Sequence, residues 1–339
     1  MHISNSNAPI TVLMPVYNAE RYVGEAIESI LNQTFRDFKF LIIDDGSTDR
    51  SCEIIRAYSL EDHRIELVIN ESNMGITKTL NKGLSMIDTP YIARMDSDDI
   101  SLPHRFEKQL DIMENNSDID VCGTWFDYFG NNSGMVMHPE RDEDIKLALL
   151  FYCSLGHPTV MLRNETLKRN NFEYSNYAKD AEDYDLWVRM ASTSIFYNIQ
   201  ESLLRYRVHG DNISVKKANI QLESFKKSRD WFLSKLGVVD RQLIEMLNKD
   251  RYACSVQDLH NIQKILVSIC QANKKQKLFN QHKLETMASN KFFSYCFYST
   301  RHGFLVYNIF FSSNFYQFLS LSVKKKIEFF IRAWLRIKK

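Results

Sequence analysis

Three carboxylates are crowded into the stretch Asp96-Ser97-Asp98-Asp99, directly after the apolar run at residues 91–95. The run is typical of a short buried strand, so Asp96 and Asp98 should project to the same side of an extended backbone. Carboxylates held this close repel each other unless a cation or a proton lies between them. At the carboxyl end of a strand in an α/β sheet, this pattern predicts a site for a hard divalent cation beside a phosphate-bearing ligand.

A turn or a helix N-cap is the alternative for this stretch, because Asp is common in both. A calcium loop of the EF-hand type is excluded, since counting from Asp96 places Ile100 at the fifth position and Ser101 where glycine is required. The chain also lacks a Gly-x-Gly-x-x-Gly or Walker A sequence, which disfavours a dinucleotide fold and a P-loop enzyme. Phosphate binding would then depend on a metal ion, and this favours the metal site.

A second acidic pair, Glu182-Asp183, precedes Leu186 and Met190, whose spacing is typical of a helix with one buried face. The pair should therefore lie in the first turn, where free N–H groups and the helix dipole favour anions. Capping accounts for one of the two acids and leaves the other to face a ligand. His209 follows a strand predicted at 203–208, where a lone histidine is either an ordinary surface residue or a ligand to the metal or pyrophosphate.

These groups depend on elements that alternate regularly. The hydrophobic pattern predicts strands at 10–14 (stopped by Pro15), 38–43, 65–69 and 91–95, and helices at 20–32, 51–58 and about 75–86. This rhythm predicts right-handed βαβ units in an α/β fold with a mostly parallel, doubly wound sheet. Polar residues at 15–18, 44–47 and 96–99 follow three of the strands, so they would converge on one crevice.

Taken together, these residues resemble the inverting glycosyltransferases of family 2, whose nucleotide-sugar-binding domain has the GT-A fold. The resemblance covers roughly residues 8–215. Its segments, in chain order, are Val12-Leu13-Met14-Pro15-Val16-Tyr17-Asn18, Ile42-Ile43-Asp44-Asp45-Gly46-Ser47-Thr48-Asp49, Asn73-Met74-Gly75, Leu80-Asn81-Lys82-Gly83, Ala93-Arg94-Met95-Asp96-Ser97-Asp98-Asp99, His157-Pro158, Glu182-Asp183-Tyr184-Asp185-Leu186-Trp187 and Arg205-Tyr206-Arg207-Val208-His209.

The resemblance implies a role for each matching position. Asp45 would accept a hydrogen bond from uracil, and Asp183 would be the general base, with Glu182 beside it facing the acceptor. Asp98 would bind Mn²⁺ or Mg²⁺, assisted by Asp96, and His209 would be a neighbour of the metal or pyrophosphate. The remaining residues expected to contact the nucleotide-sugar are Pro15, Val16, Tyr17, Asn73, Gly75, Lys78, Asp96 and Ser97.

The 339 residues are enough for a catalytic domain, expected at 1–219, and a mainly helical region, expected at 220–339. The net charge of +1 gives no reason to expect nucleic acid as a partner. The six cysteines are scattered, and the polar start of the chain lacks the apolar segment of a secretory signal. Both features favour the cytoplasm.

The end of the chain predicts a basic amphipathic helix. Ile327, Phe330, Ile331, Trp334 and Leu335 have the spacing of one apolar stripe. Seven basic residues accompany one acid, Glu328, in this segment: Lys324, Lys325, Lys326, Arg332, Arg336, Lys338 and Lys339. We expect residues 322–339 to lie on the inner face of the cytoplasmic membrane as a peripheral contact. The alternative is a terminal helix packed on its own domain with a solvated basic face.

The predicted activity is transfer of a hexose or N-acetylhexosamine from a UDP-sugar to a glycan or a polyprenyl-diphosphate-linked acceptor. The resemblance implies inversion to a β-linkage and a place in the synthesis of O-antigen, capsule or lipopolysaccharide. A sugar-nucleotide nucleotidyltransferase is one rival, although the glycine-rich loop expected of it is missing around Pro15. A non-catalytic module that binds nucleotide-sugars or glycans is the other, and it would not need a base such as Asp183.

Overall fold

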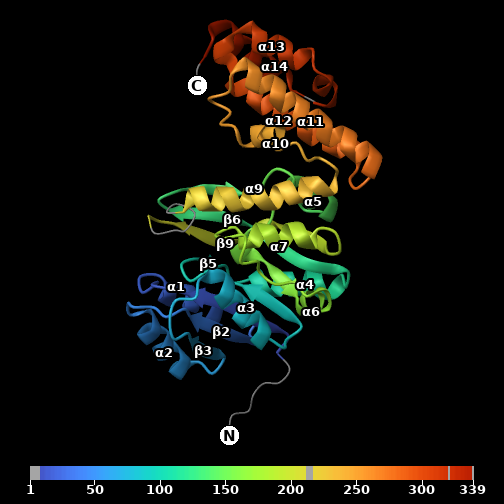
Figure 1. Ribbon diagram of the computed structural model, residues 1–339. Coiled ribbons are helices and arrows are strands. Elements are labelled where there is room, and N and C mark those ends of the chain that lie inside the picture. Colours follow the sequence, from blue (N-terminus) through green and yellow to red (C-terminus); the bar gives the residue numbers. More distant parts are fainter. Residues whose placement is uncertain (1–7, 211–216, 320, 338–339) are drawn as a thin grey trace. The chain divides into compact units, whose positions relative to one another are not determined.

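The computed structural model describes residues 8–210, 217–319 and 321–337. The chain forms two compact units that divide between Arg229 and Asp230 (Figure 1). The division lies within the helix α9 (Ala218–Lys235), which also contains residue 219, where we expected the catalytic domain to end. The boundaries of the functional domains remain a prediction.

One mixed sheet of nine strands organises the first unit, with the order β3-β2-β1-β4-β8-β6-β9-β5 and with β7 paired to β6. The strands are β1 (Ile10–Val16), β2 (Phe38–Asp44), β3 (Ile65–Ile69), β4 (Tyr91–Arg94), β5 (Ile100–Ser101), β6 (Ile119–Gly130), β7 (Gly134–Val136), β8 (Met161–Arg163) and β9 (Ile195–Val208).

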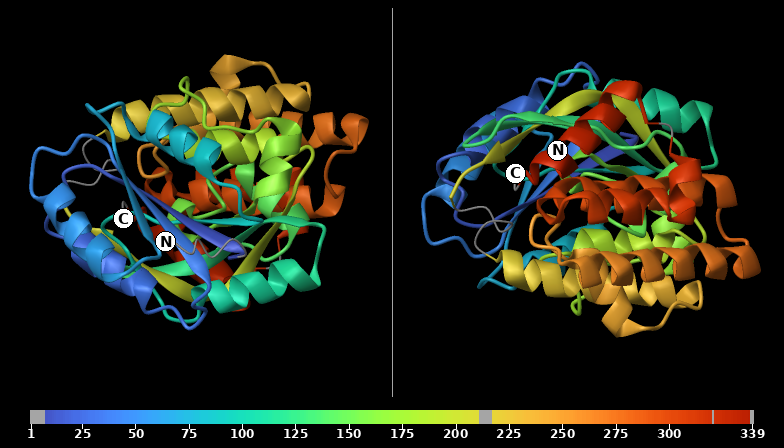
Figure 2. Two further views of the ribbon diagram at one scale, coloured as in Figure 1. Left: turned by 90° about the horizontal axis from the view of Figure 1, so that it is seen from below. Right: turned by 90° about the horizontal axis from the view of Figure 1, so that it is seen from above.

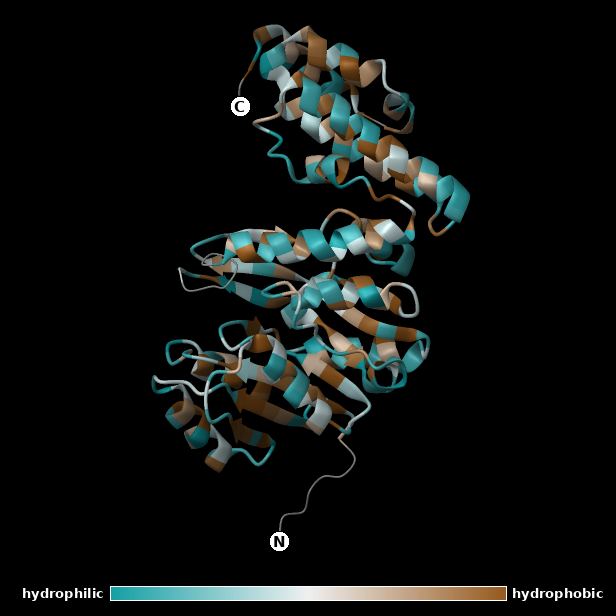
Figure 3. Ribbon diagram, in the orientation of Figure 1, coloured by the Kyte–Doolittle hydropathy of each residue, from teal (hydrophilic) through white to brown (hydrophobic). Residues whose placement is uncertain are grey.

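The first four strands are parallel to one another, as the alternating pattern predicts. They are the apolar strands of the core, shown in brown in Figure 3. Contrary to the prediction, β1 does not stop before Pro15 but runs on to Val16. The proline is tolerated because β4 pairs only with Ile10 to Leu13, so no ladder hydrogen bond to β4 is needed at position 15.

Helices cover both faces of this parallel half (Figure 2). One face of β1, with Val12 and Met14, packs in the cluster that contains Ile27 of helix α1 (Val23–Leu31). The other face carries Leu13, which lies close to Gly83 of helix α3 (Ile76–Met86). A Cβ on this glycine would be 2.3 Å from Leu13 Cδ1. The close approach of α3 to the sheet therefore requires glycine at position 83.

The second half of the sheet is mixed. Strand β8 is antiparallel to β4 and β6, whereas β6 and β9 are parallel with irregular register. The helices of this unit are α1 (Val23–Leu31), α2 (Ser51–Glu61), α3 (Ile76–Met86), α4 (Arg105–Asn115), α5 (Asp142–Leu149), α6 (Asn164–Asn170) and α7 (Glu182–Met190), with a 3-10 turn at His157–Thr159. The predicted α/β fold with a mostly parallel sheet is confirmed, with antiparallel pairings added in its second half.

The second unit is helical, as expected. Its α-helices are the end of α9, α10 (Arg241–Glu245), α11 (Val256–Gln276), α12 (Gln281–Tyr298), α13 (Phe304–Phe311) and α14 (Val323–Leu335). Buried aromatic rings fill its core, among them Phe292, Phe310 and Phe329. Across the part of the chain that the structure describes, no helix combines the length and apolar character needed to cross a membrane.

Candidate active site

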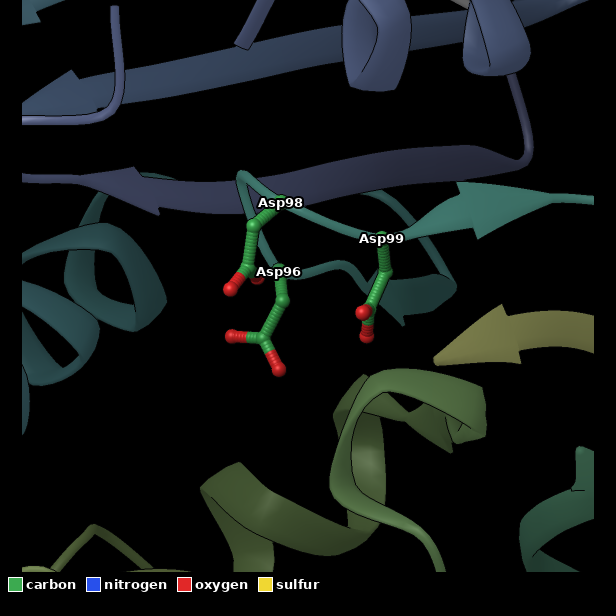
Figure 4. A group of neighbouring side chains, drawn as sticks. All are labelled: Asp96, Asp98 and Asp99. Carbon is green, nitrogen blue, oxygen red and sulfur yellow. The ribbon is translucent and has the colours of Figure 1, made fainter. Parts of the chain in front are cut away.

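The loop between β4 and β5 carries the carboxylates of Asp96, Asp98 and Asp99, which point to the same side of the chain (Figure 4). Each offers an oxygen atom, and these atoms all lie within 4.8 Å of one another. The loop begins where the buried strand β4 ends, so the sheet holds the three acids at the carboxyl end of a parallel strand. This is the edge at which ligands bind in open α/β sheets.

Burial makes this cluster electrostatically unfavourable without a cation. Burial, and then the charge of Asp96, raises the pKa of Asp98. Burial and the charges of Asp96 and Asp98 raise the pKa of Asp99 well above its ordinary value. Asp99 Oδ2 is buried and has no hydrogen-bond partner among the described residues. A hard divalent ion with oxygen ligands fits these groups, because it would satisfy the buried oxygen and offset the repulsion.

A second layer of side chains holds this loop against β9. The backbone N–H of Arg207 donates to Asp99 Oδ1 over 2.8 Å, and Arg207 Nε donates to the carbonyl oxygen of Asp98 over 2.7 Å. His209 Nε2 lies 2.8 Å from Asp98 Oδ2, and its ring packs 4.6 Å from that of Tyr22. His209 thus contacts a candidate metal ligand, while its own role as a ligand remains a prediction.

Arg94 is a buried cation at the base of the site that our sequence reasoning did not select. Its side chain is 4% exposed, and Nη1 lies 2.5 Å from Asp96 Oδ2. Burial lowers the pKa of Arg94, but the charge of Asp96 raises it by more. The guanidinium therefore stays charged. The same positive charge lowers the pKa of the buried His157 and opposes the upward shifts of Glu182 and Asp183. Arg94 therefore links the two acidic groups electrostatically.

The acidic pair Glu182-Asp183 opens helix α7, as its position before an apolar helical pattern predicts. Trp187 and Leu186 are buried on the inner face of this helix, and the Tyr184 hydroxyl donates to the carbonyl oxygen of Leu149 over 2.6 Å. These contacts fix the first turn. Neither acid caps the helix in the expected way, because the N-cap residue is Ala181.

Burial dominates the protonation of this pair. Burial, and then the charge of Asp183, raises the pKa of Glu182 to about 8. Glu182 is 7% exposed, and its Oε2 has no hydrogen-bond partner among the described residues. Burial also raises the pKa of Asp183, which is half-buried and has Cys153 Sγ 3.9 Å from its Oδ2. Acids whose pKa is raised by burial are suited to proton transfer near neutral pH.

At the end of β2, Asp45 is already engaged by the protein. Its carboxylate accepts hydrogen bonds from Asn70 Nδ2 (2.7 Å) and from the backbone N–H groups of Met74 (2.9 Å) and Gly75 (2.8 Å). The uracil contact expected for Asp45 therefore remains a prediction. Its neighbour Asp44 is 1% exposed, and its Oδ1 has no hydrogen-bond partner among the described residues. Asp44 is thus an additional candidate that the sequence pattern did not separate from Asp45.

The other predicted donor-binding residues surround these strand ends. Pro15 and Val16 are buried within β1, whereas Tyr17 is 48% exposed in the turn that follows. Asn73 and Lys78 are exposed, while Gly75 and Ser97 are partly buried. The structure brings the strand ends to one edge of the sheet, because Asp45 N donates to Val16 O over 2.7 Å. None of these contacts by itself tests the predicted binding roles.

Gly46 allows the turn after β2 to approach the loop that carries Asn73. Its φ is +69°, and a Cβ at this position would lie 2.7 Å from the carbonyl carbon of Ser72. Both the left-handed backbone and the close approach require glycine.

Comparisons with known proteins agree with this geometry. Residues 11–176 match the family model described as Glycosyl transferase family 2. The O-antigen biosynthesis glycosyltransferase WbnJ of Escherichia coli is 32% identical over 235 residues, which span 65% of this chain and 90% of WbnJ. The uncharacterized glycosyltransferase MJ1057 of Methanocaldococcus jannaschii is 38% identical over 207 residues, spanning 59% of this chain and 70% of MJ1057.

The chain belongs to glycosyltransferase family 2. The resemblance inferred from the sequence is confirmed. Among solved structures, this family 2 glycosyltransferase is similar to S. aureus TarS 1-349 in complex with UDP-GlcNAc, with a TM-score of 0.59 and 17% identity. The match covers 84% of this chain and 89% of the TarS chain, and it supports the GT-A fold.

Proposed function

We propose that the protein transfers a hexose or N-acetylhexosamine from a UDP-sugar to a glycan or lipid-linked acceptor, with inversion. The observation that carries the proposal is the pairing of two acidic groups across one buried cation. The Asp96-Asp98-Asp99 cluster and the Glu182-Asp183 pair both lie within electrostatic range of Arg94. The UDP-GlcNAc in the TarS complex supports a uridine nucleotide as the donor.

In this proposal Asp183 accepts the proton of the acceptor hydroxyl as its oxygen forms a bond to the anomeric carbon. The bond between that carbon and the β-phosphate oxygen breaks, and its electrons leave with the UDP. The attack comes from the face opposite the leaving group, so an α-linked donor gives a β-linked product. One carboxylate suffices for this step. Glu182, protonated at neutral pH by its raised pKa, can donate a hydrogen bond to the acceptor.

Asp96, Asp98 and Asp99 would hold Mn²⁺ or Mg²⁺, with His209 as a further candidate. When bound, the ion would act as a Lewis acid that offsets the charge developing on the diphosphate. The side chain of Arg94 would hold Asp96 in position for this role, because Nη1 lies 2.5 Å from Asp96 Oδ2.

The acceptor and location are also part of the proposal. WbnJ acts in O-antigen biosynthesis, which supports a role in O-antigen, capsule or lipopolysaccharide assembly for this chain. A polyprenyl-diphosphate-linked acceptor would place the enzyme at the inner face of the cytoplasmic membrane, with residues 322–339 as a peripheral contact. Lys338 and Lys339 lie outside the described residues.

The two rival functions are less well supported. Family membership disfavours a sugar-nucleotide nucleotidyltransferase. A binding module without activity would not need two buried acids with raised pKa values opposite a metal-type cluster, because burying them costs stability.

The test compares Asp183→Asn with Asp185→Asn, the same chemical change two residues along helix α7. Asp185 is turned toward Arg189, whose Nε lies 2.8 Å from its Oδ2, so it serves as the control. We expect Asp183→Asn to lower sugar transfer about 10²- to 10⁴-fold, the usual contribution of a general base, and to leave UDP binding unchanged. Normal turnover in Asp183→Asn would remove Asp183 from the mechanism.

A further inference from the structure

We propose that the second unit binds an anionic lipid surface through one face formed by α14 and the start of α13. The inference deepens the proposed function, since a lipid-linked acceptor would bring the enzyme to such a surface. Its structural basis lies entirely within the second unit.

The structure separates the face by which α14 packs from the apolar stripe predicted in the sequence. Phe329 and Ala333 are the buried residues of this helix. Phe329 packs against the rings of Phe293 and Tyr307, with centroids 5.3 and 5.4 Å away. Phe329 and Ala333 therefore anchor the helix to its own unit, and of the stripe Phe330 adds a ring contact to α13.

The stripe itself is exposed. The exposed fractions are 53% for Ile327, 47% for Phe330, 43% for Ile331, 65% for Trp334 and 56% for Leu335. At about 100° of rotation per helical residue, the centre of this stripe lies roughly 150° from the packed pair. The structure bears out the packing of the terminal helix on its own unit, which uses the face of Phe329 and Ala333, and it leaves most of the stripe exposed on another face.

The exposed surface continues onto the neighbouring helix. The ring of Phe304, at the start of α13, lies 5.2 Å from that of Phe330. Phe304 is 39% exposed, and Leu305 beside it is 51% exposed. Two helices thus contribute to one apolar surface with an aromatic share, which is typical of side chains that enter the boundary between lipid headgroups and acyl chains.

Exposed basic residues lie along the same helix, and at about 100° of rotation per residue Lys324 is the one nearest the stripe. Lys324, Lys325, Lys326 and Arg336 are exposed, and Glu328 is the acid among them. Three of these lysines occupy the first turn of α14, where the helix dipole disfavours cations, so helix stability does not explain their position. Attraction to a negatively charged surface outside the protein would explain their position. A second copy of the chain is a poorer occupant, because it would bring two sets of these lysines together.

The experiment measures sedimentation of the full-length protein with lipid vesicles. We expect binding to vesicles in which about a third of the lipid is anionic, little binding to zwitterionic vesicles, and weaker binding as salt rises. Replacing Lys324, Lys325 and Lys326 together by Gln should weaken binding about a hundredfold at low salt, since each charge contributes about fivefold.

A second variant tests the apolar stripe. Ile327→Ser combined with Trp334→Ser should weaken vesicle binding at least tenfold. Leu278→Ser is the control, because Leu278 is 55% exposed between α11 and α12, away from the stripe. Equal binding by the stripe variant and the control would overturn the proposal. So would a dimer, seen by light scattering, that the stripe substitutions dissociate.

Transfer to a water-soluble acceptor separates this inference from the proposed function. The stripe variants should transfer sugar to such an acceptor at the normal rate. If they do so and the native chain fails to bind anionic vesicles, only the lipid contact is wrong. If vesicle binding is as expected and the native protein transfers no sugar, the proposed function is wrong by itself.

Discussion

Glu182 offers a measurable consequence of burying an acid whose Oε2 has no hydrogen-bond partner among the described residues. It is the first residue of α7 and is 7% exposed. Burial, with the charge of Asp183, raises its pKa from the ordinary 4.5 to about 8. The folded protein therefore holds a proton on Glu182 at neutral pH that the unfolded chain releases. We predict that Glu182→Gln makes stability less dependent on pH, because glutamine is similar in shape to the protonated acid.

The sign and size follow from the two pKa values. Because the folded state has the higher pKa, the contribution of Glu182 to stability is fully present below about pH 4.5 and is lost as pH rises through about 8. At about 1.4 kcal/mol per pKa unit, the loss between pH 5 and pH 9 is on the order of 4 kcal/mol. Relative to the native chain, Glu182→Gln should gain about this much stability over the same range.

The assay is urea unfolding followed by tryptophan fluorescence at both pH values. Trp231 and Trp334 are replaced by Phe, so the signal comes from the first unit, where Trp187 is buried in the same helix as Glu182. Glu165→Gln is the control, because Glu165 is an exposed acid in the first turn of α6. A stability difference between Glu182→Gln and the native chain that is the same at pH 5 and pH 9 would refute the argument.

Three further predictions concern the metal ion and the two aspartates at the end of β2. Removal of divalent cations with EDTA should abolish sugar transfer. Addition of Mn²⁺ should restore transfer in the native chain but not in Asp98→Asn. Full activity in EDTA would contradict the role of the Asp cluster. Asp44→Asn should weaken UDP binding about tenfold, measured by calorimetry, with a smaller effect on folding than Asp45→Asn, since the Oδ1 of Asp44 has no hydrogen-bond partner among the described residues. Asp45→Asn should instead lower the melting temperature, because three donors from residues 70–75 depend on its carboxylate. Weaker UDP binding in Asp45→Asn, with normal binding in Asp44→Asn, would favour the uracil contact at Asp45.

The sequence was sufficient to predict the features that depend only on residues close together in the chain. The parallel strands β1 to β4 could be predicted because each is a short apolar run followed by a polar turn. The acids of the β4–β5 loop could be predicted because their spacing is local and the phosphate-binding glycines are missing. The course of β1 through Pro15 could not, since a proline is tolerated there only where the neighbouring strand β4 has already ended.

The interactions between side chains far apart in the chain could not be predicted from the sequence. Arg94 lies inside an apolar run, and a charged residue there was a signal that we did not use. Asp96 lies beside it, whereas Glu182, far along the chain, comes within range of its charge only in the folded protein. Asp44 and Asp45 are neighbours of the same type, and only the packing of the 70–75 loop shows which of them is already satisfied.

By itself, the sequence determined the family, the α/β order of elements and the two groups of acids, because motif spacing and hydrophobic period are local properties of the chain. Only the tertiary structure decided how those groups are charged and which surfaces remain exposed. Burial raises the pKa of Glu182, and the packing of Phe329 leaves the Trp334 stripe uncovered. Both depend on which distant residues exclude water from a given side chain, and that is a property of the folded chain alone.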